Sequence, residues 1–188
     1  MANVNAPNGF VPLRHLTGGV IRANEYAIAN GYAANLASGD LVTLATDGTV
    51  VRGTAGGTAL GVFYGVEYID NDTGDVKFKK VWSNATAVKS GTPIKAYVYD
   101  DPNITYAVQT NGVFATANVG ELANVTIGTY NSTYGHSTDE LDIATLATTA
   151  KVLRILRLID YPNNAAGADA SVEVVINLSL YGTRQAGV

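Results

Sequence analysis

The sequence predicts an all-β protein: an antiparallel β-sandwich or barrel, jelly-roll-like, with an extended N-terminal arm. Three observations lead to this prediction. Several segments alternate apolar and polar residues with a period of two, and clusters of Gly, Asn, Asp and Pro separate them. Hydrophobic residues make up 47% of the chain and charged residues only 15%, a composition typical of a folded core. Many short strands between turn signals are typical of sandwiches and barrels.

The N-terminal segment, residues 1–19, is predicted to be an extended arm. Pro7 and Pro12 exclude a helix, because proline lacks the amide donor and restricts the residue before it to extended conformations. The segment also carries large apolar side chains, which need a surface to bind: Phe10, Val11, Leu13 and Leu16. We therefore expect the arm to dock on a neighbouring subunit or on the lattice of a larger assembly, and we expect residues 20–188 to fold without it as a single β domain.

A first hairpin is predicted over residues 60–82. Alternate residues of its first strand share one apolar face: Leu60, Val62, Tyr64, Val66 and Tyr68. Residues 70–75 form the turn, in which Gly74 can adopt a positive φ. The returning strand, residues 76–82, alternates apolar side chains with lysines: Val76, Phe78 and Trp82 against Lys77 and Lys79.

Two more strand pairs are predicted along the chain. Residues 94–99 and 104–109 are expected to form a second hairpin around Pro102. Residues 171–182 alternate clearly, whereas residues 151–160 also fit helical spacing. Their β-branched content and the loop that follows favour a strand that pairs with residues 172–180. Shorter strands are expected near residues 20–29, 41–45, 49–52 and 124–128, with a long exposed excursion over residues 112–142.

Charge and cysteine content argue against several function classes. The net charge is −4 and no basic stripe is visible, so we expect no nucleic-acid partner. No run of eighteen apolar residues is present, so we expect no membrane span, and the N-terminus does not resemble a secretion signal. The absence of cysteine excludes disulfides and thiolate chemistry.

Candidate catalytic and metal-binding residues are few. His136 precedes Ser137 and several acidic residues, but adjacent strand side chains point apart, so a polar surface turn is favoured over a hydrolase site. Asp70, Asp72 and Asp75 are closely spaced, as in some calcium sites, but the pattern of a calcium-binding loop is incomplete, and the sequence leaves calcium binding open. We predict no catalytic, cofactor-binding or metal-binding residue, and no cofactor.

Eleven tyrosines against four phenylalanines suggest contact surfaces, because tyrosine combines an apolar ring with a hydrogen-bonding tip. Ordinary cross-strand packing explains this bias equally well. Tyr97, Tyr99 and Tyr106 are placed together on the second hairpin. The candidate interface residues taken from the arm and the excursion are Phe10, Val11, Leu13, Arg14, Leu16, Tyr130 and Tyr134.

A family resemblance extends over nearly the whole chain. It is carried, in order, by the segments MANVNAPNGFVPLRHLTGGVIRANEYAIANGYA, LGVFYGVEYID, AYVYDDPN, GHSTDELD and NNAAGADASVEVVINLSLYG. Together they resemble small virion proteins of tailed bacteriophages, the capsid decoration or cement proteins. The resemblance implies a homotrimer, made in the host cytoplasm, that binds the exterior of the capsid. There it would stabilise junctions between subunits of the major capsid protein, its expected partner besides itself.

Two alternative functions stay open at the level of sequence. The tyrosines and the β architecture also fit a carbohydrate-binding tail or surface module of a virion. An enzyme built around His136 and its acidic neighbours is the other alternative, and it would lose a pH-dependent activity on substitution of His136.

Overall fold

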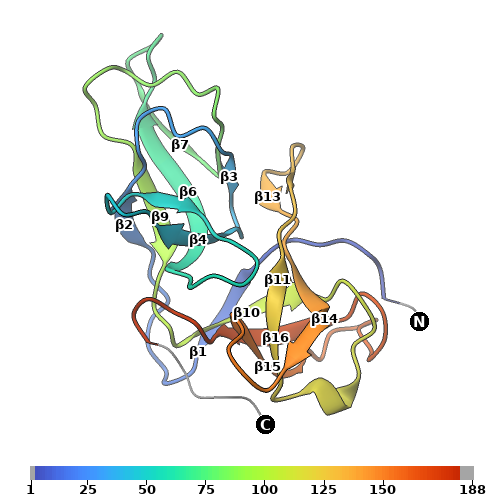
Figure 1. Ribbon diagram of the computed structural model, residues 1–188. Helices are drawn as coiled ribbons and strands as arrows, with labels where there is room; N and C mark the ends of the chain where they lie inside the picture. The colour runs from blue at the N-terminus through green and yellow to red at the C-terminus, as the bar shows by residue number, and fades with distance from the viewer. Residues whose placement is uncertain (1–2, 183–188) are drawn as a thin grey trace.

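The structure is a computed structural model in which residues 3–182 are described, so the outermost residues of the predicted arm and β domain, 1–2 and 183–188, lie outside the described residues. It confirms the all-β prediction. Two antiparallel sheets form the two halves of an elongated molecule (Figure 1), and two short ribbons complete them. Within residues 3–182, no helix has the length and apolar character needed to cross a membrane.

The first sheet forms the lower half of the molecule in Figure 1. Its strands, in spatial order, are β1 (Val11–His15), β10 (Ile104–Gln109), β16 (Ser171–Ile176), β15 (Leu153–Leu158), β11 (Leu122–Thr126) and β14 (Glu140–Ala147). A short 3₁₀ helix, η1 (Thr116–Asn118), precedes β11.

The second sheet forms the upper half. Its strands are β2 (Asn24–Ala27), β9 (Lys95–Tyr99), β6 (Gly61–Ile69), β4 (Leu41–Leu44) and β5 (Val50–Arg52), with β7 (Val76–Lys79) paired to β6. The two short ribbons pair β3 (Leu36–Ala37) with β8 (Val81–Trp82), and β12 (Tyr130–Asn131) with β13 (His136–Ser137).

Each half has its own hydrophobic cluster, and strands of the second sheet contribute to both. Leu41 and Val62 pack in the first cluster, whereas their chain neighbours Val42 and Phe63 pack in the second. Because successive side chains of a strand point to opposite faces, β4 and β6 lie between the two cores and join them.

The extended N-terminal arm is not confirmed, because Val11–His15 form strand β1 at the edge of the first sheet. Val11 pairs with Ala107 and His15 with Ile104. Phe10, just before the strand, is only 1% exposed and belongs to the first cluster. The sequence shows no period here because a bulge between Pro12 and Arg14 interrupts the alternation.

The first hairpin is confirmed, but its faces differ from the prediction. Strands β6 and β7 pair with Ile69 opposite Val76. A bulge between Phe63 and Gly65 shifts the alternation by one residue, so Phe63 is buried and Tyr64 is 42% exposed. Phe78, which was expected on the buried face, is 52% exposed.

The prediction that residues 94–99 and 104–109 form a hairpin is wrong, although both strands exist. Strand β9 lies between β2 and β6, and β10 lies between β1 and β16, so neither strand has a free edge for the other. The chain passes from one sheet to the other at residues 100–103. Period-two patterns predict strands, but they do not identify the partners of those strands.

The remaining predicted pair is confirmed. Strands β15 and β16 are antiparallel neighbours, with Leu153 opposite Ile176 and Leu158 opposite Val172. The shorter strands expected near residues 20–29, 41–45, 49–52 and 124–128 correspond to β2, β4, β5 and β11.

Candidate binding groove and aromatic surface

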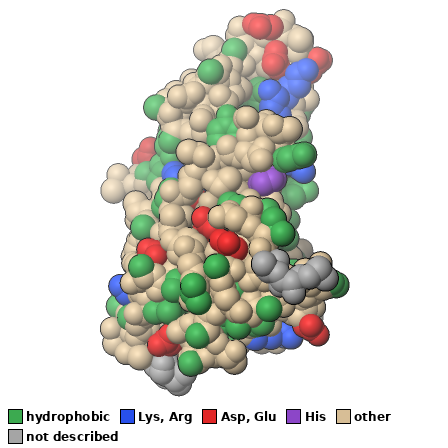
Figure 2. Space-filling model, turned by 90° about the vertical axis from the view of Figure 1, so that its right-hand side faces the viewer, with side chains coloured by type: hydrophobic (Ala, Val, Ile, Leu, Met, Phe, Trp, Pro, Cys, Tyr) green, Lys and Arg blue, Asp and Glu red, His purple; other side chains and the backbone are tan. Residues whose placement is uncertain are grey.

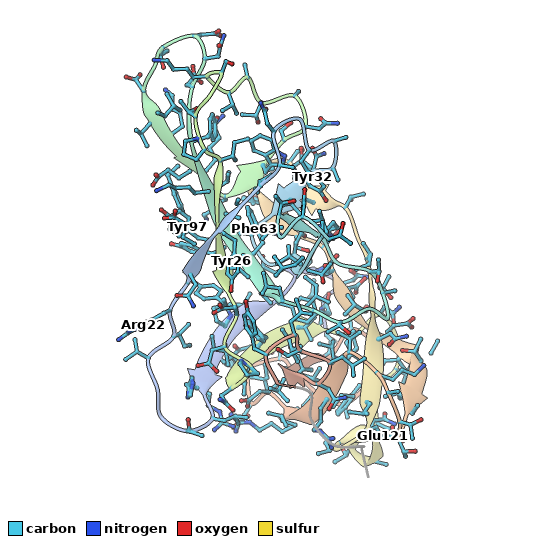
Figure 3. The ribbon with its side chains drawn as sticks, turned by 60° about the vertical axis from the view of Figure 1, so that its left-hand side comes forward. Arg22, Tyr26, Tyr32, Phe63, Tyr97 and Glu121 are labelled. Carbon is cyan, nitrogen blue, oxygen red and sulfur yellow. The ribbon has the colours of Figure 1, made fainter. Side chains whose placement is uncertain are left out.

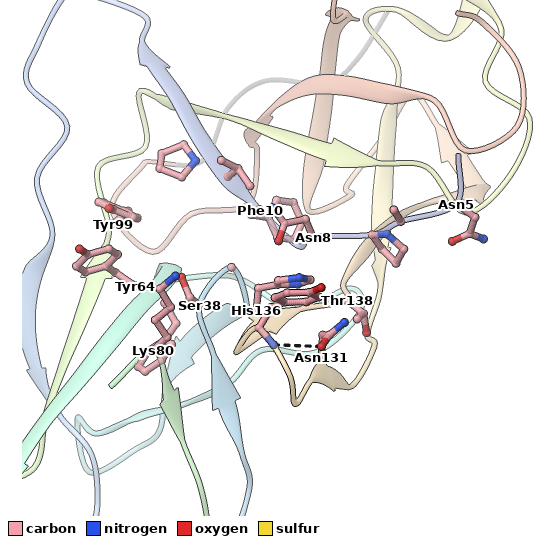
Figure 4. Close-up of a pocket in the computed structure, with 17 residues that line it drawn as sticks. Asn5, Asn8, Phe10, Ser38, Tyr64, Lys80, Tyr99, Asn131, His136 and Thr138 are labelled. Carbon is pink, nitrogen blue, oxygen red and sulfur yellow. Dashed lines mark hydrogen bonds between the residues drawn. The ribbon is translucent and has the colours of Figure 1, made fainter. Parts of the chain in front are cut away.

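An open groove of about 920 Å³ lies where the two halves of the molecule meet. Its walls come from the N-terminal segment before β1, the loop after β3, the start of β6 and the ribbon β12–β13. Figure 4 shows Tyr64 and Tyr99 at one end of the groove, His136 and Asn131 farther along it, and Asn5 beyond them.

Close backbone contacts hold the groove walls together. The amide of Phe10 donates to the carbonyl of Gly39 at 2.9 Å, and the amide of Ser137 donates to the carbonyl of Ser38 at 2.8 Å. Gly9 has φ +62°, and a Cβ built on it would overlap the side chain of Ser137. A glycine is therefore required for the N-terminal segment to cross so close to β13.

The ribbon side of the groove presents two stacked rings. The Tyr134 and His136 ring centroids are 5.9 Å apart, and the ring planes differ by 4°. The side chain of Asn131 shapes the turn before them, because its Oδ1 accepts the amides of Thr133 at 3.0 Å and Tyr134 at 3.2 Å. Tyr134 is 69% exposed, so most of its ring is available to a ligand.

The end of the groove at Tyr64 and Tyr99 continues into a row of four aromatic side chains on the second sheet. We call this the aromatic row, and it consists of Tyr64, Phe78, Tyr97 and Tyr99. Adjacent centroids are 5.4 to 5.8 Å apart. In Figure 3 the labelled Tyr97 lies at the margin of the molecule and Phe63 in its interior.

Gly65 makes the aromatic row continuous. It pairs with Tyr97 across β6 and β9, and a Cβ on it would lie 2.7 Å from Cζ of Phe78. Because glycine has no side chain, the Phe78 ring crosses the β6 backbone and reaches Tyr97. The hydroxyl of Tyr97 donates to Glu67 at 3.1 Å, and this hydrogen bond raises the Tyr97 pKa.

Among the described residues, the groove lining carries one lysine and one histidine, Lys80 and His136, and no carboxylate. Lys80 is exposed, and His136 is half-buried beneath Tyr134. The other polar lining groups are neutral amides and hydroxyls, from Asn5, Asn8, Asn131, Ser38 and Thr138 among others. Figure 2 shows one long face of the molecule, on which acidic and basic side chains lie next to each other near the top and at the lower right, and an acidic group without basic neighbours lies near the centre.

A buried ionic cluster lies at the junction of the two halves. Arg52 forms ion pairs with Asp40 and with Asp139, and both carboxylates are fully buried. Burial raises the pKa of Asp139, while the charge of Arg52 and the amides of Gly128 and Leu41 oppose this rise. Arg52 comes from the second sheet and Asp139 precedes β14 of the first, so the cluster joins the two halves.

The predicted interface residues are dispersed by the fold. Phe10, Val11 and Tyr134 line the groove, but Phe10 is buried there and cannot insert into a partner. The exposed fractions of Val11 and Leu16 are 38% and 37%. Of the other three, Arg14 forms an ion pair within the chain, and Leu13 and Tyr130 are half-buried.

Arg14 binds its own sheet. Its Nε lies 2.7 Å from Oε1 of Glu173, and Arg157 Nε lies 2.5 Å from the other carboxylate oxygen. The Glu173 side chain is fully buried, so this triad ties β1 to β16 and β15. A partner at this position would compete with an existing ion pair.

The other candidate residues serve local structure. His136 Nδ1 lies 3.0 Å from the backbone oxygen of Ser137, whereas the Ser137 hydroxyl accepts the amide of Asp139. Asp70 accepts the amides of Asp72 and Thr73, as in an Asx turn. Within the described part of the chain, no group of three metal-ligating side chains comes together.

Sequence reasoning did not identify Phe78 and Lys80 as surface candidates, and it placed Tyr106 on the surface although Tyr106 is fully buried. One signal was present for Phe78. Gly65 lies in the middle of a strand, where a glycine often indicates close approach of another group. No comparable sequence signal identifies Lys80. It lines the groove only because the tertiary fold brings it there.

Comparison of the chain with protein-family models, with curated proteins and with solved structures finds no match.

Proposed function

We propose that this chain is a structural protein of a virion, a capsid decoration protein that binds the exterior of a phage head. In this proposal it stabilises junctions between subunits of the major capsid protein. The family resemblance supplies the partner, and the aromatic row supplies a surface suited to it. No reaction is required of such a protein, only binding to a repeated lattice.

The aromatic row carries the proposal. Tyr64 and Phe78 are 42% and 52% exposed although both are large and largely apolar. Aromatic residues are enriched at the buried centres of protein interfaces, and polar residues surround them at the rim. Here the rim consists of a charged group beside Tyr97, in which Lys95 lies 3.2 Å from Glu25 and 3.8 Å from Glu67.

Self-association is the second part of the proposal. Large apolar side chains are also exposed on loops of the first sheet, with exposed fractions of 67% for Val113, 46% for Tyr161 and 57% for Tyr181. A cyclic trimer would cover such residues with neighbouring copies of the chain. Sedimentation equilibrium at micromolar concentration should report three chains per particle.

The mechanism we propose is thermodynamic linkage. A protein that binds only the mature, expanded lattice stabilises that lattice over the form it does not bind. Several contacts per trimer act together, because the second and third contacts form at high effective concentration. Weak individual interfaces can therefore give durable attachment.

The direct test is co-sedimentation with expanded capsids that lack the protein. We expect the wild-type chain to pellet with capsids and the Tyr64→Ala, Phe78→Ala double variant to stay in the supernatant. Val20→Ala, at a residue that is 72% exposed and outside both the row and the groove, is the matched control and should pellet like wild type.

Two results would contradict the proposal. One is failure of the wild-type protein to pellet with capsids. The other is equal pelleting of the double variant, which would remove the aromatic row from the contact. Cryo-electron microscopy of purified virions would then show whether the chain occupies the capsid exterior.

A further inference from the structure

We infer that the groove between the two halves binds an oligosaccharide that carries an acidic sugar. This site goes beyond capsid attachment. It shares Tyr64 and Tyr99 with the aromatic row, whereas Lys80 and Tyr134 belong to the groove alone. Four observations about the groove carry the inference: its size, its aromatic rings, its neutral hydrogen-bonding groups and the sign of its charge.

Size and ring geometry fit a short oligosaccharide. A groove of about 920 Å³ is in the range of ligand sites in proteins. Sugar rings have apolar faces of C–H groups that pack on aromatic rings. The groove offers such rings at two places along its length, Tyr64 with Tyr99 at one end and Tyr134 over His136 farther along.

The polar lining fits hydroxyl groups. The side-chain amides of Asn5 and Asn8 can donate and accept hydrogen bonds, as a sugar hydroxyl requires, and the NH2 group of Asn131 can donate. The Ser38 hydroxyl adds a further partner, and the Thr138 hydroxyl, which donates to the carbonyl of Thr129, can still accept. A ligand rich in hydroxyls can therefore exchange its water for these groups without leaving them unpaired.

The charge of the groove indicates an acidic ligand. The protein has a net charge of −4, yet the titratable groups on the groove lining, apart from the tyrosines, are Lys80 and His136. The carboxylates next in sequence to the lining residues Gly39 and Thr138, those of Asp40 and Asp139, are fully buried and paired with Arg52. A carboxylate on the ligand would meet the exposed Lys80 ammonium without a competing acidic side chain on the lining.

The structure favours a saccharide over a peptide strand. A peptide would bind most readily by pairing with a free strand edge, and β1 is the edge strand beside the groove. Pro12 lacks the amide donor needed for that pairing, and a bulge follows it. A polypeptide occupant is therefore an outcome of the test that would overturn the inference.

The experiment uses the full chain and defined probes. A glycan array with acidic and neutral oligosaccharides comes first. It is followed by calorimetric titration with trigalacturonic acid and with its methyl ester, and with sialyllactose and with its methyl ester. Within each pair the ring system is retained and the charge is removed. We expect at least one acidic member to bind, and its neutral counterpart to bind about tenfold more weakly or not at all.

Two variants connect binding to the groove. Tyr134→Ala and Lys80→Gln each change an exposed side chain outside the aromatic row, so folding should be unchanged, which thermal melts will verify. Each should weaken binding of the acidic probe about fivefold to tenfold. Val20→Ala should bind like wild type. Lys80→Gln should affect the acidic probe more than any neutral one.

The outcomes separate this inference from the proposed function. Loss of saccharide binding with normal capsid pelleting in both groove variants supports the inference. Absence of binding to every acidic member, equal binding of acidic and neutral members, or unchanged binding in both variants overturns it. Density for a capsid polypeptide in the groove of decorated virions also overturns it, while leaving the proposed capsid attachment intact.

Discussion

Phe10 packs edge-on against Tyr106: the ring centroids are 6.2 Å apart and the planes are perpendicular. Phe10 is 1% exposed and Tyr106 is fully buried, so the contact lies inside the first core. Such edge-to-face pairs add to the stabilisation that comes from burial alone. The N-terminal segment is therefore part of the β domain, and its removal should affect folding before it affects any partner.

The first prediction concerns Phe10. Phe10→Ala should lower the free energy of unfolding by about 3–5 kcal/mol, because it leaves a cavity beside Tyr106. Deleting residues 2–16 should destabilise the fold further, because it also removes strand β1 and exposes the edge of β10. Urea unfolding followed by tyrosine and tryptophan fluorescence measures the stability of the Phe10→Ala variant and of the deletion variant. Val20→Ala is the control, and a midpoint for Phe10→Ala equal to that of the control would contradict the prediction.

The second prediction concerns pH and Glu173. Burial raises the pKa of Glu173, but hydrogen bonds from Arg14, Arg157 and Thr105 outweigh burial and hold its pKa below the ordinary 4.5. The folded state therefore favours the ionised form. The resulting stabilisation is complete above about pH 5 and is lost as the pH falls through 4.5 towards the lower folded-state value.

Glu173→Gln should remove this pH dependence. At pH 7 we expect the variant to be about 1–3 kcal/mol less stable than wild type, because the guanidinium groups lose their charged partner. The difference should shrink as the pH falls from about 5 to 3. Unfolding free energies measured across this range test it, and a difference that stays constant down to pH 3 would show that Glu173 has an ordinary pKa.

The third prediction concerns the ionic cluster between the two halves. Arg52→Ala leaves the buried carboxylates of Asp40 and Asp139 without their cation, so we expect a loss of about 3–5 kcal/mol. Lys95→Ala breaks surface pairs with Glu25 and Glu67 and should cost less than about 1 kcal/mol. Chemical denaturation compares the two variants, and similar small losses would argue against a structural role for the cluster.

The fourth prediction concerns the approach of β6 to the chain that follows β9. A Cβ on Gly61 would overlap the carbonyl oxygen of Tyr99 and lie 2.9 Å from Cα of Asp100. Gly61→Ala should therefore force backbone movement and lower the melting temperature, at a cost of about 1–3 kcal/mol.

Gly112→Ala is the matched control for Gly61→Ala. Its Cβ would meet the Ile143 side chain at 3.4 Å, an ordinary contact, so the melting temperature should change little. Differential scanning calorimetry of the two variants gives the comparison, and an equal effect at both sites would disprove the steric argument.

Several elements could be predicted from the sequence because their signal is local. The alternation in residues 60–68 and 171–176 predicts strands, and the turn at residues 70–75 fixes the β6–β7 hairpin. Strand β1 could not be predicted in the same way. Pro12 and the following bulge remove the period, and its pairing with β10 joins residues about ninety positions apart.

The candidate site shows the same division. Tyr134 could be proposed from the sequence because a tyrosine in a polar turn is expected to be exposed. The aromatic row could not, because the bulge at Phe63 and Gly65 decides which side of β6 Tyr64 occupies. The groove depends on contacts among Gly9, Gly39 and Ser137, which no local pattern reveals.

The sequence by itself determined that this protein is all-β, where most of its strands lie, and that β15 pairs with β16. These follow from alternation and turn residues, which act over a few positions. Only the tertiary structure decided that β9 and β10 belong to different sheets, that Phe10 is a core residue, and that two halves enclose a groove. Strand partners are selected by which edges remain free and by which apolar faces can bury one another, and both depend on the whole chain.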